Sequence, residues 1–279
     1  GNMHEHFQQD TPAFRWHRFT PDGARLEQWT FQVPDLPWAR ASYQCYSSIL
    51  ELDGGDLLTA LEWVTLLPES ERWRDFGGRE RKLRFGTFIV RSSDCGRTWK
   101  YVTKFDPADV KPVYGVHDLE VEEGLDEADL ALLPNGDILC VMRTDSYAPM
   151  WQARSTDGGY TWTQPESTGW QGVKPRLEVL PSGVLACAAG RGGYGHPQVT
   201  HVMLSLDGTG QHWEQPFYFH TGPGCSYTTT MQRDGKLHVV YSHSDFTREL
   251  GIHGLPSQTI RRAVLDIEVV GRVPSPSGP

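Results

Sequence analysis

Short runs of apolar residues that alternate with polar ones recur along the chain, and a glycine-containing turn joins these runs in pairs. Four segments share this order, "YSSILELDGGDLLTALEW", "ADLALLPNGDILCVMRT", "RLEVLPSGVLACAAGR" and "YTTTMQRDGKLHVVYSH". Alternation with period two predicts half-buried strands, and Asn135-Gly136 and Asp234-Gly235 are strong hairpin signals. No apolar stripe of helical period extends beyond two turns. The pattern predicts an all-β protein.

A polar turn that ends in tryptophan follows three of the four segments. It reads "SSDCGRTW" at 92–99, "STDGGYTW" at 155–162 and, one residue longer, "SLDGTGQHW" at 205–213. The aspartate of such a turn accepts hydrogen bonds from the following backbone N–H groups, glycine supplies a positive φ, and tryptophan covers the turn. A catalytic acid is needed once per site, whereas this aspartate recurs. We therefore interpret the turn as a structural clasp and not as a catalytic acid at Asp94 or Asp157.

The spacing of the hairpins gives the size of the repeated unit. Gly136, Gly183 and Gly235 are 47 and 52 residues apart by their positions in the sequence, which suits a four-stranded sheet. Repeats of this period are typical of solenoids and propellers, and radially repeated four-stranded sheets form a β-propeller.

The turns resemble the Asp boxes of the sialidase (neuraminidase) superfamily, also called BNR repeats. "RFTPDGARLEQW" at 18–29 resembles a decayed further copy. The resemblance covers residues 14–270 and implies one β-propeller domain over 1–279, built of four-stranded antiparallel blades with Asp-box turns and of the six-bladed sialidase type. The blade units are expected at about 14–40, 41–105, 112–166, 168–218 and 222–270.

These units number fewer than six, and the Arg-Ile-Pro segment usual in the first sialidase blade is absent from the sequence. Two arrangements follow. The chain is an N-terminally shortened six-bladed propeller, or it closes as a five-bladed ring in which "IRRAVLDIEVV" completes a blade with the N-terminal strands.

Charge and composition narrow the choice of partners. The 279 residues carry a formal charge of −9, which argues against nucleic-acid and anionic-membrane surfaces. No apolar run approaches 18 residues, and the N-terminus lacks a signal-peptide pattern, so we expect a soluble protein; compartment and oligomeric state stay open. Cys140 and Cys187 lie in apolar runs and are expected to be buried thiols.

Sialidases of this superfamily use a tyrosine nucleophile activated by a glutamate, a separate aspartic acid, and three arginines that bind a carboxylate. "GLDEADLALLPNGDILCVMR" resembles the segment that carries the activating glutamate and one arginine, which implies these roles for Glu127 and Arg143. "GPGCSYTTTMQRDGKLHVVY" resembles the nucleophile segment, with Tyr227 as the candidate. The alternatives are a rim salt bridge for the first pair and an ordinary strand tyrosine for Tyr227.

Other candidates are less closely matched. Arg191 and Arg176 are candidates for the remaining arginines, although the usual arginine before the strand is missing in "PQVTHVMLS". Asp75, in a charged insert, is a candidate acid, with a solvated loop as the alternative. Asp145 and Tyr241 are further candidate substrate contacts.

The resemblance therefore implies an exo-acting glycoside hydrolase for a terminal acidic sugar, with a carbohydrate partner and no cofactor. The 11 histidines show no zinc-binding spacing, so no metal is expected. One alternative is a polysaccharide lyase that abstracts a proton beside a uronate carboxylate. Another is a non-catalytic propeller that binds glycans or proteins through its aromatic residues.

Overall fold

The computed structural model describes residues 14–31, 42–74, 80–81, 83–105, 124–144, 148–190, 199–221, 227–245 and 257–268. Every pair of named strands in these ranges is antiparallel. A single 3-10 turn, η2 (Glu69–Glu71), is the helical element of this part of the chain. The all-β prediction is confirmed. No helix in the described ranges has the length and apolar character needed to cross a membrane.

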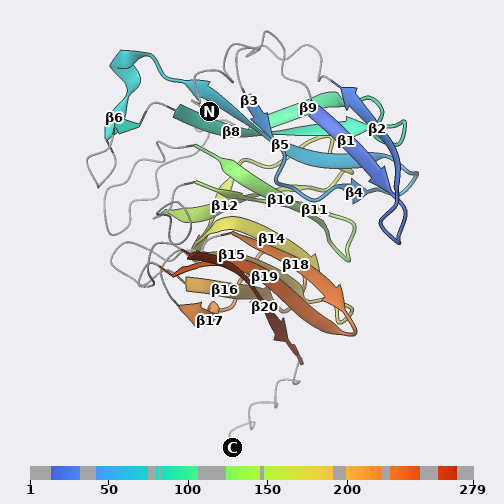
Figure 1. The fold of residues 1–279 in the computed structure, drawn as a ribbon, viewed down its shortest axis with the longest axis vertical. Helices are drawn as coiled ribbons and strands as arrows, with labels where there is room; N and C mark the ends of the chain where they lie inside the picture. The colour runs from blue at the N-terminus through green and yellow to red at the C-terminus, as the bar shows by residue number, and fades with distance from the viewer. Residues whose placement is uncertain are drawn as a thin grey trace, which may run out of the picture.

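The strands form five successive main sheets, which we number I to V in chain order (Figure 1). Sheet I contains β1 (Phe14–Phe19) and β2 (Arg25–Phe31). Sheet II contains β3 (Ser42–Gln44), β4 (Leu50–Glu51), β5 (Leu57–Leu66), β8 (Leu83–Ser92) and β9 (Lys100–Phe105). A small separate ribbon pairs β6 (Trp73–Arg74) with β7 (Glu80–Arg81).

The other three sheets follow the same order. Sheet III contains β10 (Asp126–Leu132), β11 (Ile138–Arg143), β12 (Pro149–Ser155) and β13 (Glu166–Gln171). Sheet IV contains β14 (Val173–Val179), β15 (Leu185–Gly190), β16 (Val199–Ser205) and β17 (Phe217–Thr221). Sheet V contains β18 (Thr228–Arg233), β19 (Lys236–Asp245) and β20 (Ser257–Leu265).

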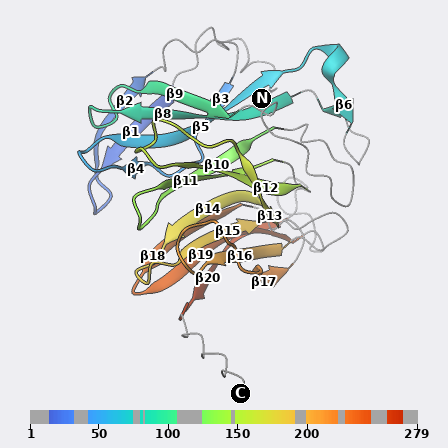
Figure 2. The same ribbon diagram turned by 180° about the vertical axis from the view of Figure 1, so that it is seen from behind.

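The sheets stack face to face, and an apolar layer fills each interface (Figures 1 and 2). Every residue of β11 and β15 is buried, because neighbouring sheets cover both faces of these strands. Cys140 and Cys187 contribute free, buried thiols to these layers, as their apolar surroundings predicted. The first strands β10, β14 and β18 lie side by side along the stack.

Sheets I and V lie at opposite ends of the stack in both ribbon views (Figures 1 and 2). In the described residues β1 pairs with β2, whereas β20 pairs with β19. The described strands therefore do not show the pairing of the C-terminal strand with the N-terminal strands that the five-bladed alternative requires. Sheet I instead packs on sheet II, where Trp16 stacks on Trp99 with ring centroids 5.2 Å apart.

The predicted hairpins are present, but they differ in turn type. Asp234 and Gly235 both have positive φ, 52° and 75°, and they directly join the paired residues Arg233 and Lys236. This geometry is that of a type I′ turn. In the hairpin at Asn135-Gly136 only the glycine has positive φ, at 87°.

The first two Asp boxes form the predicted clasps. The Asp94 carboxylate accepts a hydrogen bond from the Thr98 N–H at 2.8 Å, and Asp157 accepts one from the Thr161 N–H at 2.9 Å. Each tryptophan indole N–H donates to a glycine carbonyl of its own turn, at 3.0 Å in the first box and 3.1 Å in the second. These bonds occupy the aspartates within their turns and support the structural interpretation.

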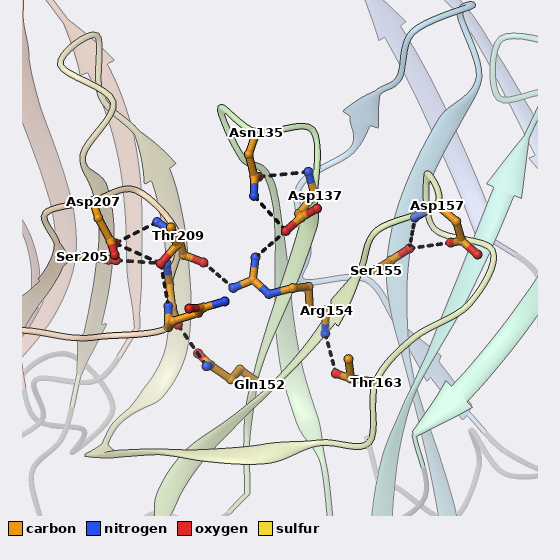
Figure 3. A network of polar contacts seen from close by, with 12 residues as sticks. Asn135, Asp137, Gln152, Arg154, Ser155, Asp157, Thr163, Ser205, Asp207 and Thr209 are labelled. Carbon is orange, nitrogen blue, oxygen red and sulfur yellow. Dashed lines mark hydrogen bonds and ion pairs between the residues drawn. The ribbon is translucent and has the colours of Figure 1, made fainter.

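The third box closes differently because it contains one additional residue. Its Trp213 indole N–H donates to the Gln152 side-chain oxygen of sheet III, at 3.0 Å. The Gln152 amide also donates to the Gly210 carbonyl of the box, at 3.0 Å. Figure 3 shows Gln152 reaching across from its own strand to this turn.

An arginine directly before the first two boxes links each sheet to the next. Arg91 contacts Asp56 of its own sheet at 2.6 Å and donates to the Gly158 carbonyl of the following box at 2.7 Å. Arg154 repeats the arrangement: it contacts Asp137 at 3.0 Å and donates to the Thr209 carbonyl (Figure 3). We call these two groups the arginine links.

Candidate functional site

Glu127 is the second residue of β10 and lies in a β-bulge. The register between β10 and β11 shifts after the pair Asp126 and Arg143, and Glu127 has a φ of 43°. A bulge bends a strand and redirects its side chains. The Glu127 carboxylate meets the Arg143 guanidinium, with Oε1 and Nη1 3.0 Å apart and side chains only 5% and 9% exposed.

Two donors from neighbouring sheets reach the Glu127 carboxylate, and Tyr227 lies close to it. Arg143 of sheet III contacts Oε1, and the backbone N–H of Lys174 in sheet IV donates to Oε2 at 2.9 Å. Tyr227, just before sheet V, lies near enough that, besides burial, the charge of the same carboxylate raises the pKa of its phenol. The predicted nucleophile, its predicted base and one predicted arginine therefore converge at the first strands of neighbouring sheets.

Tyr227 is partly exposed, and its hydroxyl is partly buried. The residue is 45% exposed. Burial of the hydroxyl raises the pKa of Tyr227 above its ordinary value, and the charge of Glu127 raises it further. The phenol therefore keeps its proton at neutral pH, and a base in direct contact is needed to remove that proton during attack.

Lys174 occupies the same place in sheet IV that Glu127 occupies in sheet III. It lies at a register shift near the start of β14 and has a φ of 52°. Its ammonium lies 3.8 Å from the centroid of the Tyr46 ring and donates to the Tyr46 carbonyl at 3.1 Å. Burial, and then the nearby Arg176, lower the pKa of Lys174 to about 8.

Glu62 brings a second carboxyl group to the site from β5 of sheet II. It is 5% exposed, and its Oε2 accepts a hydrogen bond from the Glu127 N–H at 3.1 Å. Burial is the main reason that the pKa of Glu62 rises to about 7; the Glu127 carboxylate adds to the rise, while Arg143 opposes it.

Arg176 is bound within the framework of the site. Its Nη1 donates to the Tyr46 carbonyl at 2.7 Å and to Asp129 Oδ1 at 3.2 Å. Asp129 is fully buried and also accepts hydrogen bonds from the backbone N–H groups of Ser48 and Leu177, at 2.7 and 2.8 Å. Asp129 thus joins sheets II, III and IV, and it holds Arg176 close to the site.

The remaining predicted residues are not part of this described group. Tyr241 packs between sheets IV and V, against Phe219 at 5.6 Å and His220 at 5.1 Å between ring centroids. Asp75, Asp145 and Arg191 lie outside the described residues. Among the residues that the structure describes, no group of three or more His, Cys, Asp or Glu side chains is arranged to hold a metal ion.

Sequence reasoning missed Tyr46, Glu62 and Lys174. A signal existed for two of them. Glu62 is the one charged residue in the strand "LLTALEWVTL". Lys174 is the second residue of the first strand of its unit, as Glu127 is in the preceding unit. No comparable pattern marks Tyr46, which lies in the segment between β3 and β4.

Stacked antiparallel sheets, Asp boxes and a tyrosine–glutamate pair between first strands define a protein of the sialidase-like, Asp-box class. The sequence pattern of the BNR repeat-like domain matches residues 77–239, more than half of the chain. The chain belongs to the BNR repeat-like domain family, and the predicted sialidase and BNR-repeat superfamily is confirmed. No curated protein sequence matches it.

Solved structures show the same fold at low sequence identity. A protein of unknown function from Dyadobacter fermentans has a TM-score of 0.60 and 18% identity, over 90% of this chain and 67% of its own. The Hadza microbial sialidase Hz136 has a TM-score of 0.60 and 16% identity, over 84% of this chain and 44% of its own. The Trypanosoma rangeli sialidase in complex with sialic acid has a TM-score of 0.51 and 14% identity, over 89% of this chain and 37% of its own. The chain thus spans less than half the length of either sialidase.

Proposed function

We propose that the chain is an exo-acting glycoside hydrolase that cleaves a terminal acidic sugar, with Tyr227 as nucleophile and Glu127 as its base. The placement of Tyr227 close to the Glu127 carboxylate carries this proposal. The backbone N–H of Lys174 donates to Glu127, and the Lys174 carbonyl accepts the hydroxyl of Thr228, the residue after Tyr227. Burial raises the pKa of the Tyr227 phenol, and the Glu127 charge raises it further. This placement puts a carboxylate that can accept a proton beside a nucleophile that keeps its proton at neutral pH. Tyr227 is 45% exposed, so a ligand can reach this residue.

The reaction follows a two-step course. Tyr227 Oη attacks the anomeric carbon as its proton passes to Glu127, and the glycosidic C–O bond breaks while the leaving oxygen takes a proton from an acid, proposed as Asp75. Water then attacks the anomeric carbon, the C–O bond to Tyr227 breaks, and the acid takes the water proton. Glu127 returns its proton to Tyr227, so both residues regain their starting states.

Recognition of the carboxylate is assigned to arginines. Arg143 presents a planar fork of donors beside the nucleophile, and Arg191 and Arg176 are proposed as its companions. The Trypanosoma rangeli sialidase, which shares the fold, was solved with sialic acid bound. We propose sialic acids and related acidic sugars as the substrate class, and Asp145 and Tyr241 as further contacts.

The same proposal includes the architecture. The five sheets are proposed as consecutive blades of one β-propeller domain of the six-bladed sialidase type, with units at about 14–40, 41–105, 112–166, 168–218 and 222–270. The face-to-face packing of sheets I to V in chain order supports this arrangement.

The first prediction tests the nucleophile. Tyr227→Phe removes only the hydroxyl, so turnover of aryl sialosides and uronate oligosaccharides is expected to fall by at least about 10³-fold. Tyr218→Phe is the matched control, because Tyr218 is 52% exposed on β17 and lies outside the group around Glu127. The control should retain wild-type rates.

Product masses distinguish the remaining functions. Addition of water to the products supports hydrolysis, whereas an unsaturated product of elimination would identify a lyase. Equal turnover by Tyr227→Phe and wild type would remove Tyr227 from the mechanism. Saturable glycan binding without turnover would identify a binding protein and overturn the proposed hydrolase.

A further inference from the structure

Sheet II contacts the backbone at and just before the start of β10 at three residues, Gly124, Leu125 and Glu127. Gly124 forms a bridge with Phe85, and the Thr87 hydroxyl donates to the Leu125 carbonyl at 2.9 Å. Glu62 then accepts the N–H of Glu127 at 3.1 Å. Glu62 and Thr87 are register partners on neighbouring strands, so their side chains lie next to each other on one face. We call Glu62 and Thr87 the backbone clamp.

The backbone that this clamp holds is strained. Glu127 has a φ of 43°, in the left-handed region that residues with a Cβ avoid. At Gly124, with a φ of 110°, an added Cβ would lie 1.9 Å from the Phe85 carbonyl oxygen. A strained conformation persists only where its surroundings enforce it. The hydrogen bond to Glu62 is one such restraint at Glu127 itself.

Glu62 of the clamp also interacts electrostatically with the charged groups of the site. Glu62 is almost completely buried, and the charges that act on it come from sheets III and IV, on Glu127, Arg143 and Lys174. Burial raises the pKa of the Tyr46 phenol, in the segment before β4, and the charges of Glu62 and Asp126 add to that rise. Two acidic groups in such contact influence each other's protonation.

We propose that Glu62 is a positioning residue that fixes the backbone and orientation of Glu127, and that the charge state of Glu62 tunes how readily Glu127 accepts the Tyr227 proton. The kinetic part rests on the proposed function, whereas the structural part does not. A negative charge on Glu62 favours protonation of Glu127, and therefore favours proton transfer from the phenol. Turnover is expected to rise as Glu62 ionises, around pH 7.

The stability arm needs no substrate. Because the pKa of Glu62 is raised from 4.5 to about 7 in the folded protein, the native state binds the additional proton, and stability is lost as pH rises through this interval. As the pH is raised from 4.5 to 7, the urea concentration at the unfolding midpoint should decrease more for the wild type than for Glu62→Gln. In a Glu127→Gln background this difference should shrink, because one source of the raised pKa is gone.

The kinetic arm compares Glu62→Gln with wild type on the aryl glycoside that the wild type cleaves fastest. We expect kcat to fall about 10- to 100-fold with little change in KM, because misplacement of a catalytic group costs about this much. The rise in rate near pH 7 should also disappear. Thr87→Val, which removes the uncharged half of the clamp, should lower kcat but keep that rise.

Glu178→Gln is the matched control. Glu178 lies on β14 and its pKa is also raised by burial, but its hydrogen bonds go to Gln232 and Thr230 of sheet V. The Glu178→Gln substitution should leave kcat unchanged. It should also leave unchanged the effect of Glu127→Gln on the pH dependence of the urea midpoints. A pH dependence of urea midpoints that is the same in wild type and Glu62→Gln would overturn the inference. A chain that cleaves no glycoside yet passes the stability arm would refute the proposed function alone.

Discussion

At the scale of single residues, the two complete Asp boxes differ at one backbone position. Cys95 and Gly158 both follow the aspartate of their box, and both have positive φ, 60° and 74°. Glycine adopts this conformation freely, whereas a residue with a Cβ is penalised by about 1–2 kcal/mol. The first box therefore carries a conformational cost that the second avoids.

Cys95→Gly should stabilise the protein. The relieved strain exceeds the additional entropy of glycine in the unfolded chain, so the free energy of unfolding is expected to rise by about 1 kcal/mol. Urea unfolding followed by tryptophan fluorescence measures this change. The reciprocal variant Gly158→Ala should be destabilised by a similar amount. A lower unfolding midpoint for Cys95→Gly would show that the cysteine side chain contributes more than its strain costs.

The resemblance to a known family singled out part of the candidate site. Glu127, Arg143 and Tyr227 were found because their spacing matches a known segment, and the structure brings them together. Glu62 and Lys174 carried only weak signals, a charge within a strand and a place at the start of a unit, which did not show what these residues contact. Their roles depend on a bulge and on contacts between sheets, which leave no local periodic pattern.

At the scale of elements, the arginine links are the polar counterpart of the apolar layers. Each link ties a hairpin and an Asp box of consecutive sheets through one guanidinium. In sheet IV the corresponding residue before the box is Leu204, so the chemistry of the link changes there. Between sheets IV and V, His220 Nε2 and His243 Nδ1 instead lie 3.0 Å apart.

Arg154→Met should weaken the junction between sheets III and IV. Methionine keeps the apolar stem but leaves Asp137, with a 19% exposed side chain, without its ion pair. A loss of about 2 kcal/mol in the free energy of unfolding is expected. Arg18→Met is the control, because the pair of Arg18 with Glu27 is 57% and 37% exposed and should contribute less than about 1 kcal/mol. Equal losses in both variants would contradict a special role for the link.

Hairpins and boxes were predictable because glycine, asparagine and aspartate act locally. Asp234-Gly235 forms the two-residue turn that its composition favours, and the first two boxes close within their own residues. The arginines before the boxes gave no such signal, since their partners lie 35 and 67 residues away for Arg91. The sequence left the partner of β20 open between two arrangements, because strand partners depend on the whole chain; in the described residues β20 pairs with β19.

At the scale of the whole molecule, burial is graded along the stack. β11 and β15 are buried throughout, whereas the end strands expose apolar side chains, with Leu26 58% and Ile260 83% exposed. Sheets that pack against two neighbours gain more from burial than sheets that pack against one.

Hydrogen exchange should reveal this gradient. Amides of β11 and β15 are expected to exchange only through global unfolding, and those of β1, β2 and β20 should exchange earlier through local opening. Mass spectrometry of peptic fragments measures both. Uniform protection across all five sheets would show that the end sheets unfold together with the centre.

The bulges at Glu127 and Lys174 have one last consequence. The same local backbone shape recurs in adjacent repeats, yet it delivers an anion in one and a cation in the other. The bulge is thus a position that accepts side chains of either charge, so the chemistry of the site can change by substitution of one residue at a bulge without a change in the fold.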